Sequence, residues 1–257
     1  MVRLLSGLVL AAAALAAILF LPPLALRVVA VVVAVAACFE YVAIARRMNV
    51  APSTWLAVVL VVAACWWVSV PGRAAAGLLV IAALLLLVDV LFLGKSLPDA
   101  SVALVAPVYV GVPLGTLVAV QALGGREAVL LLIGTVVISD SAQYYSGRTF
   151  GRHLLAPAIS PKKTIEGAIG GVVFGTLVMV VAGGWVFPFA RHTMLFVMGI
   201  AIVLLGIAGD LFESRLKRIA GLKDSSAIIP GHGGVLDRID ALLFASPAFY
   251  LFLNLIM

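Results

Sequence analysis

The most polar part of this hydrophobic sequence is the segment SRLKRIAGLKDSSAIIPGHGGVLDRID near the C-terminus, which runs from Ser214 to Asp240. Nine of the chain's 28 Asp, Glu, Lys and Arg residues lie within positions 213–240. Asp210 precedes the segment and Asp237 lies near its end. Carboxylate oxygens suit Mg²⁺, which usually takes one or two protein carboxylates and completes its octahedron with water and substrate phosphates. The residue types therefore predict a magnesium site that meets a phosphorylated substrate.

Basic residues and a glycine turn lie in the same segment. Lys and Arg side chains hold phosphate oxygens through charge-assisted hydrogen bonds. The candidates are Lys217, Arg218, Lys223 and Arg238. The turn PGHGG, in which Gly233 and Gly234 follow His232, lets backbone amides approach a ligand, and the helix that starts after it offers its N-terminus to an anion. A metal, cations and a glycine turn together indicate a phosphoanhydride substrate.

A second polar loop, at residues 146–167, reads SGRTFGRHLLAPAISPKKTIEG. Its SPKKT string places two cations and a hydroxyl, from Lys162, Lys163 and Thr164, after a turn constrained by proline. These side chains are expected on the same membrane face as residues 213–240. An enzyme that joins a soluble nucleotide to a lipid phosphate needs such groups at the level of the headgroups.

The helices that precede the two loops carry Asp140 and Asp210. A carboxylate that faces lipid at mid-membrane costs on the order of 2.5 to 3.5 kcal/mol, so we expect both to face a polar interior. Asp140 has two open roles: a contact with metal or nucleotide, or a packing hydrogen bond to Tyr144 across one helical turn. Glu40 and Asp89 are further acids in apolar runs for which the sequence suggests no partner.

The elements that position these residues are membrane helices. The chain is 65% hydrophobic and 11% charged, with a mean hydropathy of +1.27, whereas about a quarter of residues are charged in typical soluble domains. A helix needs roughly 20 apolar residues to cross a bilayer. The apolar runs are 4–21, 24–45, 55–70, 74–94, 101–123, 127–145, 168–187, 194–212 and 241–257. The sequence thus predicts an all-α polytopic bundle of about nine transmembrane helices.

We expect this bundle to divide into N-terminal helices, residues 1–126, and a catalytic region, residues 127–257, that contains both polar loops. A cleaved signal peptide is the competing interpretation of residues 1–21, although LPPLAL is a poor cleavage site. With the N-terminus in the cytoplasm and nine crossings, thirteen of the 17 Lys and Arg residues fall on the cytoplasmic side and four on the other. This bias satisfies the positive-inside rule and places the polar loops in the cytoplasm.

The pattern S-x-L-K-R-x4-K-D-x-S-x2-I-P-x-H-G-G-V-x-D-R-I-D, from Ser214 to Asp240, resembles the signature of the phosphatidate cytidylyltransferase (CDP-diacylglycerol synthase) family. The run from Asp140 to Gly167, with D-S-A-Q-Y-x2-G-R-x-F-G-R and SPKKTxEG, resembles the family's other cytoplasmic segment. The string FEYVAIAR around Glu40 resembles its second-helix motif weakly. One departure is Gln143, where the family pattern has a small residue.

This resemblance implies an enzyme of the cytoplasmic (inner) membrane that converts CTP and phosphatidic acid to CDP-diacylglycerol and pyrophosphate with Mg²⁺, commonly as a homodimer. Asp210 and Asp237 are implied as metal ligands, and a second cation is implied nearby. Lys223, Asp224 and His232 are expected to face the nucleotide as catalytic residues. The substrate contacts are expected from Asp140, Lys162, Lys163, Thr164, Lys217, Arg218, Gly233, Gly234 and Arg238. Nucleic acid is not expected as a partner, because no aromatic-rich basic module occurs.

Other interpretations stay open. Asp210 and Asp237 could be salt-bridge partners of Arg215 or Arg238, the basic residues could simply follow the positive-inside rule, and His232 could hydrogen-bond the loop backbone. A transporter of an anionic or phosphorylated solute would also bury ionisable residues, but it should show broken helices in two repeats, which the sequence lacks. A CDP-alcohol phosphotransferase would carry a D-G-x2-A-R string, which does not occur.

Overall fold

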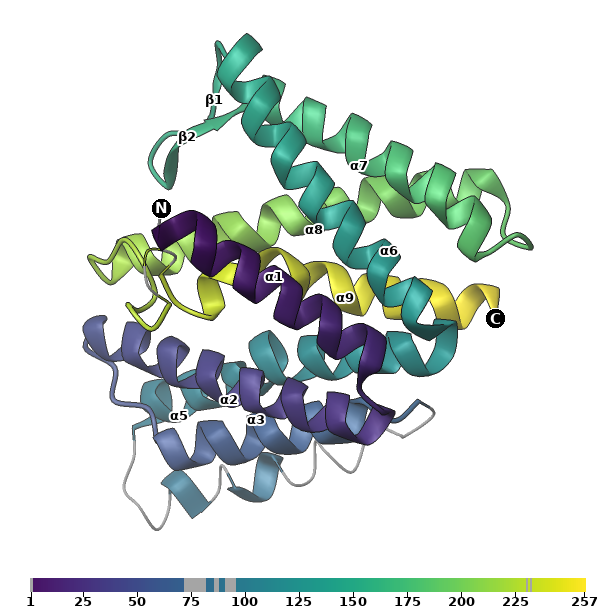
Figure 1. Cartoon of the computed structure of the whole chain (residues 1–257). Helices are drawn as coiled ribbons and strands as arrows, with labels where there is room; N and C mark the ends of the chain where they lie inside the picture. Colours follow the sequence, from purple (N-terminus) through teal and green to yellow (C-terminus); the bar gives the residue numbers. More distant parts are fainter. Residues whose placement is uncertain (1, 72–81, 86–87, 91–95, 230, 232) are drawn as a thin grey trace. The chain divides into compact units, whose positions relative to one another are not determined.

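The structure is a computed structural model that describes residues 2–71, 82–85, 88–90, 96–229, 231 and 233–257 (Figure 1). Most of the described residues are helical. The helices are α1 (Val2–Phe20), α2 (Pro23–Arg47), α3 (Thr54–Val68), α5 (Leu97–Ala106), the π-helical turn η1 (Pro107–Gly111), α6 (Val112–Phe150), α7 (Ile165–Val186), α8 (His192–Ile219) and α9 (Leu236–Ile256). A hairpin of β1 (Leu154–Ala156) and β2 (Ser160–Thr164) joins α6 to α7.

The expectation of an all-α membrane bundle is confirmed at this level. Among the described residues, five helices are long and apolar enough to cross a membrane: α2, the continuous run Leu97–Phe150, α7, α8 and α9. Shorter apolar helices cover Ser6–Phe20 and Thr54–Val68. Most of the run expected at 74–94 lies outside the described residues. Many large apolar side chains, such as Phe39, Trp185 and Val197, are exposed, as expected for a surface that faces lipid rather than water.

The chain forms two compact units, which are described separately. The first unit comprises Met1–Ala122 and Leu216–Ile239, and the second comprises Leu123–Arg215 and Asp240–Met257. The boundary between Ala122 and Leu123 lies beside Gly125, the one residue of α6 with a non-helical backbone, at φ +77°. Only glycine adopts such a conformation at little cost. The sequence-based expectation that a helix ends near residue 123 and another begins near 127 corresponds to this kink.

Small residues bring the helices of the first unit together. In Figure 1, α2, α3 and α5 run alongside one another. A Cβ atom at Gly111 or Gly115 would collide with backbone carbonyl oxygens of α3, and Ala57, Ala64 and other alanines of the unit are fully buried. Close backbone approach through small residues is the usual packing mode of membrane helices, where apolar side chains gain little by leaving lipid.

Glycines also allow close helix packing in the second unit. Gly171 and Gly175 of α7 leave room for the side chains of Gln143 and Ser139 on α6. Gly209 of α8 packs against the backbone of α9, one turn before Phe212 contacts Phe244 with ring centroids 5.6 Å apart. The β1–β2 hairpin extends from the end of α6 at which α7 begins (Figure 1). Sequence analysis expected an irregular loop at this position.

Candidate active site

Helices α8 and α9 enter the polar segment from both sides, so less of it is loop than the sequence indicated. Helix α8 continues to Ile219 and α9 begins at Leu236, whereas the apolar runs ended at 212 and resumed at 241. Lys217 and Arg218 therefore lie in the last turn of α8, where cations compensate the partial negative charge of the helix end. Asp237 lies in the first turn of α9, where a carboxylate is equally favourable.

Asp237 is the most fully bonded carboxylate of the predicted set. Its Oδ1 atom pairs with the ammonium group of Lys217, and only 6% of the Asp237 side chain and 10% of the Lys217 side chain are exposed. Its Oδ2 atom accepts hydrogen bonds from Ser225 N at 2.9 Å, Ser225 Oγ at 2.8 Å and Gly234 N at 2.8 Å. The sequence left open an ion pair of Asp237 with Arg215 or Arg238, but the partner in the structure is Lys217.

Glu40 reaches the same segment from α2 and was not assigned to it by sequence analysis. Its Oε1 atom accepts hydrogen bonds from Ser226 Oγ at 2.7 Å and Val235 N at 2.9 Å. Its Oε2 atom accepts from Ser225 Oγ and Leu236 N, both at 2.8 Å. The side chain is buried. The signals in the sequence were an acid in a mostly apolar helix and the weak resemblance of FEYVAIAR to a family motif, and neither identified a partner 185 or more positions away.

Two of the three glycines of the PGHGG turn are needed for these contacts. Gly233 has a φ of +80°, and a Cβ atom at Gly234 would collide with the Ser225 hydroxyl and the Glu40 carboxylate. The amides of Gly234, Val235 and Leu236 donate to Asp237 and Glu40. We expected the backbone amides at this helix start to bind a substrate anion, and in the structure they donate to the carboxylates of Asp237 and Glu40. The substrate contacts expected of Gly233 and Gly234 stay predictions.

Four other predicted residues of the polar segment lie at the surface. Lys223, Asp224 and Arg238 are exposed, as a group that meets a soluble nucleotide must be. The exposed Arg218 donates from Nη1 to the carbonyl oxygen of Leu222 at 3.1 Å, which closes the C-terminus of α8. His232 lies outside the described residues. The roles expected of these five residues stay predictions.

In the second unit, Asp210 pairs with a lysine of the β hairpin. Lys163 Nζ lies 2.5 Å from Asp210 Oδ2, and Ser214 Oγ donates to Oδ1 at 3.2 Å. The Asp210 side chain is 35% exposed and that of Lys163 is 20% exposed. Sequence analysis named Arg215 or Arg238 as a structural partner for this carboxylate; the lysine of the SPKKT string holds it instead. Lys163 of the loop 146–167 therefore pairs with an acid of the helix that precedes the polar segment, and this ion pair joins β2 to α8.

Local hydrogen bonds fix the hairpin that carries Lys163. Thr164 is the N-cap of α7, and its Oγ1 accepts from Gly167 N at 3.1 Å. Glu166 accepts from the backbone amides of Arg152 and His153, and His153 Nδ1 lies 2.6 Å from its Oε1. The carboxylate of Glu166, in the first turn of α7, thus holds the two residues that precede β1. Lys162 is exposed, and its expected contact with phosphate or lipid stays a prediction, as does that of Thr164.

Asp140 interacts with the residue that departs from the family pattern. Gln143 Nε2 donates to Asp140 Oδ1 at 2.9 Å and to Ser139 Oγ at 3.3 Å. The hydrogen bond to Tyr144, one of the two roles left open for Asp140, is not among the contacts of the described residues; the Tyr144 hydroxyl accepts from Arg148 Nη1 at 3.1 Å. Gln143 fits at this position because Gly171 of α7 leaves space for its side chain. The expected contact of Asp140 with substrate or metal stays a prediction.

Metal-binding potential lies in single carboxylates rather than in a cluster. Within the described ranges, no group of three or more His, Cys, Asp and Glu side chains could hold a metal ion. Asp210 and Asp237 each hold a lysine ammonium group through one oxygen, so each is a position where a cation is stable. Carboxylate oxygens are the donors that Mg²⁺ prefers, and for Asp237 only Oδ1 is suitable because Oδ2 accepts three hydrogen bonds.

Comparison with known proteins gives a consistent set of relatives. A family model described as "Cytidylyltransferase family" matches residues 1–256. A phosphatidate cytidylyltransferase of Aquifex aeolicus is 43% identical over 122 residues, 48% of this chain and 45% of that protein. The uncharacterized protein YnbB of Escherichia coli is 40% identical over 131 residues, 51% and 44% of the two chains. A phosphatidate cytidylyltransferase of Staphylococcus haemolyticus is 39% identical over 152 residues, 59% and 58%. The chain spans about half the length of the curated relatives it matches.

Proposed function

Because the chain belongs to the cytidylyltransferase family, we propose that it transfers the cytidylyl group of CTP to phosphatidic acid, with CDP-diacylglycerol and pyrophosphate as products. The relatives named phosphatidate cytidylyltransferase support this substrate pair. The structural observation that supports it best is that Asp210 and Asp237, the two acids expected to bind metal, each hold a lysine ammonium group. No observation favours the transporter alternative.

In this proposal the chain's own residues position charge. The phosphate monoester of the lipid is a nucleophile at neutral pH, so its oxygen attacks the α-phosphorus of CTP without a strong general base, and the bond to the leaving pyrophosphate breaks in line. Catalysis then consists of orientation and electrostatic stabilisation. Lys163 and Lys217 are ammonium donors already beside carboxylates. Lys223 and Arg238, which are exposed, would contact phosphate oxygens of the incoming substrates.

We propose Asp210 and Asp237 as protein ligands of Mg²⁺, and we propose that a second cation also binds. Bound there, Mg²⁺ would supply neutralisation of the triphosphate and of the leaving pyrophosphate. The single oxygen that each carboxylate offers agrees with the small number of protein ligands that Mg²⁺ takes. Each lysine would then release its carboxylate and become available to phosphate. The proposal predicts that Mg²⁺ and the two lysines compete for the same carboxylate oxygens.

The activity is tested with purified protein in detergent, given CTP, phosphatidic acid and Mg²⁺, by measuring pyrophosphate release and CDP-diacylglycerol together. Equal amounts of the two products are expected. Diacylglycerol in place of phosphatidic acid should give neither product, because it lacks the attacking phosphate, and chelation of Mg²⁺ should stop the reaction. Pyrophosphate release without the lipid, or no product with any phosphatidic acid species, would contradict the proposal.

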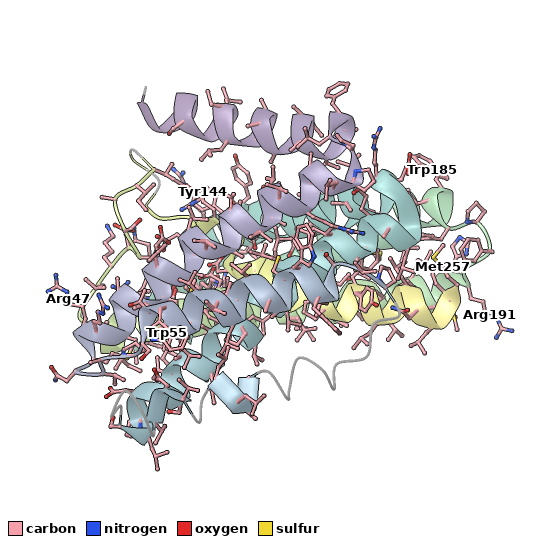
Figure 2. All side chains as sticks on the ribbon, turned by 90° about the horizontal axis from the view of Figure 1, so that it is seen from below. Arg47, Trp55, Tyr144, Trp185, Arg191 and Met257 are labelled. Atoms are coloured by element: carbon pink, nitrogen blue, oxygen red, sulfur yellow. The ribbon has the colours of Figure 1, made fainter. Side chains whose placement is uncertain are left out.

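We also propose that about nine helices cross the cytoplasmic (inner) membrane, with the N-terminus and the active site on the cytoplasmic side. Within the second unit, Tyr144 lies at one end, and Trp185, Arg191 and Met257 lie at the opposite end (Figure 2). The Tyr144 end of α6 leads into the basic hairpin, which supports its placement at the cytoplasmic surface by the positive-inside rule. Cysteines at Lys162 and Arg191 should react with impermeant thiol reagents from opposite sides of sealed vesicles. The expected homodimer is testable by crosslinking in membranes.

A further inference from the structure

Glu40 connects the two arms of the polar segment. One arm contains Ser225 and Ser226, which follow the Lys223-Asp224 pair, and the other contains Val235 and Leu236, which start α9. Each oxygen of Glu40 accepts one hydrogen bond from each arm: Oε1 from Ser226 Oγ and Val235 N, and Oε2 from Ser225 Oγ and Leu236 N. A single side chain of α2 therefore fixes the spacing of the arms.

The surroundings of the Glu40 carboxylate stabilise its charged form. Its side chain is buried, and in the described part of the chain its four hydrogen-bond donors are neutral hydroxyl and amide groups. Two of them are the amides at the N-terminus of α9, where the helix dipole favours negative charge. A buried carboxylate without such donors would be strongly destabilising. The arms and Glu40 thus stabilise one another.

Ser225 links this arrangement to the proposed metal ligand. Its hydroxyl lies 2.8 Å from both Glu40 Oε2 and Asp237 Oδ2, and its amide donates to Asp237 at 2.9 Å. A Cβ atom at Gly234 would collide with Glu40 and with the Ser225 hydroxyl, so the space between the carboxylates is filled. A shift of Glu40 must therefore displace Ser225, and Ser225 in turn contacts Asp237.

We propose that Glu40 is a positioning residue of the active site: from α2 it holds both arms of residues 225–236 and, through Ser225, the orientation of Asp237. Glu40 touches neither substrate nor the reacting atoms. The contact between Glu40 and the arms stands on the structure, whereas its effect on turnover rests on the proposed function. The two parts can be measured separately.

Glu40→Gln is the principal test because it preserves size and removes one acceptor. Whichever oxygen becomes the amide nitrogen, one hydroxyl and one backbone amide lose their acceptor; the hydroxyl can turn away, but the amide of Val235 or Leu236 cannot. Asp99→Asn is the matched control. Asp99 also accepts from a backbone amide, Ala51 N at 2.7 Å, and from a serine hydroxyl, Ser96 Oγ at 2.6 Å, but it lies in the first turn of α5, whose N-cap is Ser96.

Each variant is measured by hydrogen exchange and by steady-state kinetics. Hydrogen exchange of the peptide covering 225–236 should become about tenfold faster or more in Glu40→Gln, the change expected when a buried hydrogen bond is lost, while the peptides of α3 keep their protection. The kcat should fall about a hundredfold, as for a small displacement of a reactive group, with little change in KM for phosphatidic acid. Asp99→Asn should leave both the exchange of 225–236 and kcat as in the wild type.

Each outcome decides the proposal. Unchanged exchange at 225–236 would overturn the contact, and faster exchange with wild-type kcat would overturn the positioning role. If Glu40→Gln does not fold, Ser226→Ala, which removes one of the four donors, should show the same regional exchange with a smaller loss of kcat; no regional change would overturn the proposal. A wild-type protein without turnover would overturn the proposed function, and the exchange measurement would still decide whether Glu40 holds the arms.

Discussion

Asp237 and Asp210 carry the same expected role but have different surroundings. Asp237 accepts three hydrogen bonds on one oxygen and a lysine on the other, with 6% of its side chain exposed. Asp210 forms an ion pair with one lysine and accepts one hydrogen bond from a serine hydroxyl, and 35% of its side chain is exposed. The first carboxylate is part of the local scaffold, whereas the second can exchange its partner at little cost. Identical motif residues can therefore differ in how much stability depends on them.

The largest effect is expected from Asp237→Asn. Turnover should fall at least about a thousandfold, equivalent to about 4 kcal/mol of activation free energy. The free energy of unfolding should also fall by about 3 kcal/mol, because Lys217 would keep a buried charge without its carboxylate. Initial rates and thermal unfolding in detergent measure the two effects. A variant with normal thermal stability would show that Asp237 is not part of the scaffold.

Asp210→Asn should reduce turnover to a similar extent with a much smaller effect on folding. Its ion pair with Lys163 is partly exposed, and such pairs contribute about 1 kcal/mol or less. The same two measurements apply, and the difference in thermal stability between the two Asn variants is the quantity of interest. Equal destabilisation by both substitutions would remove the distinction between the carboxylates.

Lys163→Ala tests the surroundings of Asp210, the more exposed of the two carboxylates. Lys163 is proposed to compete with Mg²⁺ for Asp210 and then to hold phosphate, so its loss should lower the Mg²⁺ concentration needed for half-maximal rate and should lower the maximal rate by about 100-fold, as for removal of one charge-stabilising donor. Lys162→Ala is the neighbouring comparison. Its exposed side chain contributes at most about 1 kcal/mol of attraction to anionic lipid, so its effect should be smaller and should diminish at high salt. Equal effects of both variants at all salt concentrations would contradict this interpretation.

The smallest effect is expected from Gln143→Ala, which removes the hydrogen bond to Asp140. The free energy of unfolding should fall by about 1 kcal/mol, the net value of a typical hydrogen bond, and turnover should change little. Thermal unfolding and initial rates again measure the result. A large loss of turnover with unchanged stability would instead support the role of Asp140 as a substrate contact and would add Gln143 to the positioning residues.

Sequence analysis predicted what depends on local composition. The apolar runs correspond to the described helices, and the gap between the runs 101–123 and 127–145 corresponds to the kink at Gly125 in α6. Helix ends were misplaced at 212 and 241, because hydropathy alone ends a helix at its first charged residues, whereas α8 and α9 continue through them. The β1–β2 hairpin was missed since its three- and five-residue strands are too short for a periodic pattern.

The sequence named residues for the candidate site but not their contacts. The roles of Asp210, Asp237 and the lysines stay predictions, and their pairing was not foreseen: Lys163 pairs with Asp210 across 47 positions, and Lys217 pairs with Asp237. Such pairings depend on which helix ends lie together, which hydropathy does not specify. Glu40 was noticed only as a buried acid without a partner, because its four donors lie in the last quarter of the chain.

The distance along the chain between Glu40 and its donors has a consequence for biogenesis. Ser225 follows Glu40 by 185 positions, so at about 5–20 residues per second the ribosome needs roughly 10 to 40 s to supply the first of its partners. During that interval α2 is already made, and its carboxylate must be satisfied by water or by passing partners. The hydrogen bonds of Glu40 therefore form in full only after residue 236 has been synthesised, long after α2 itself.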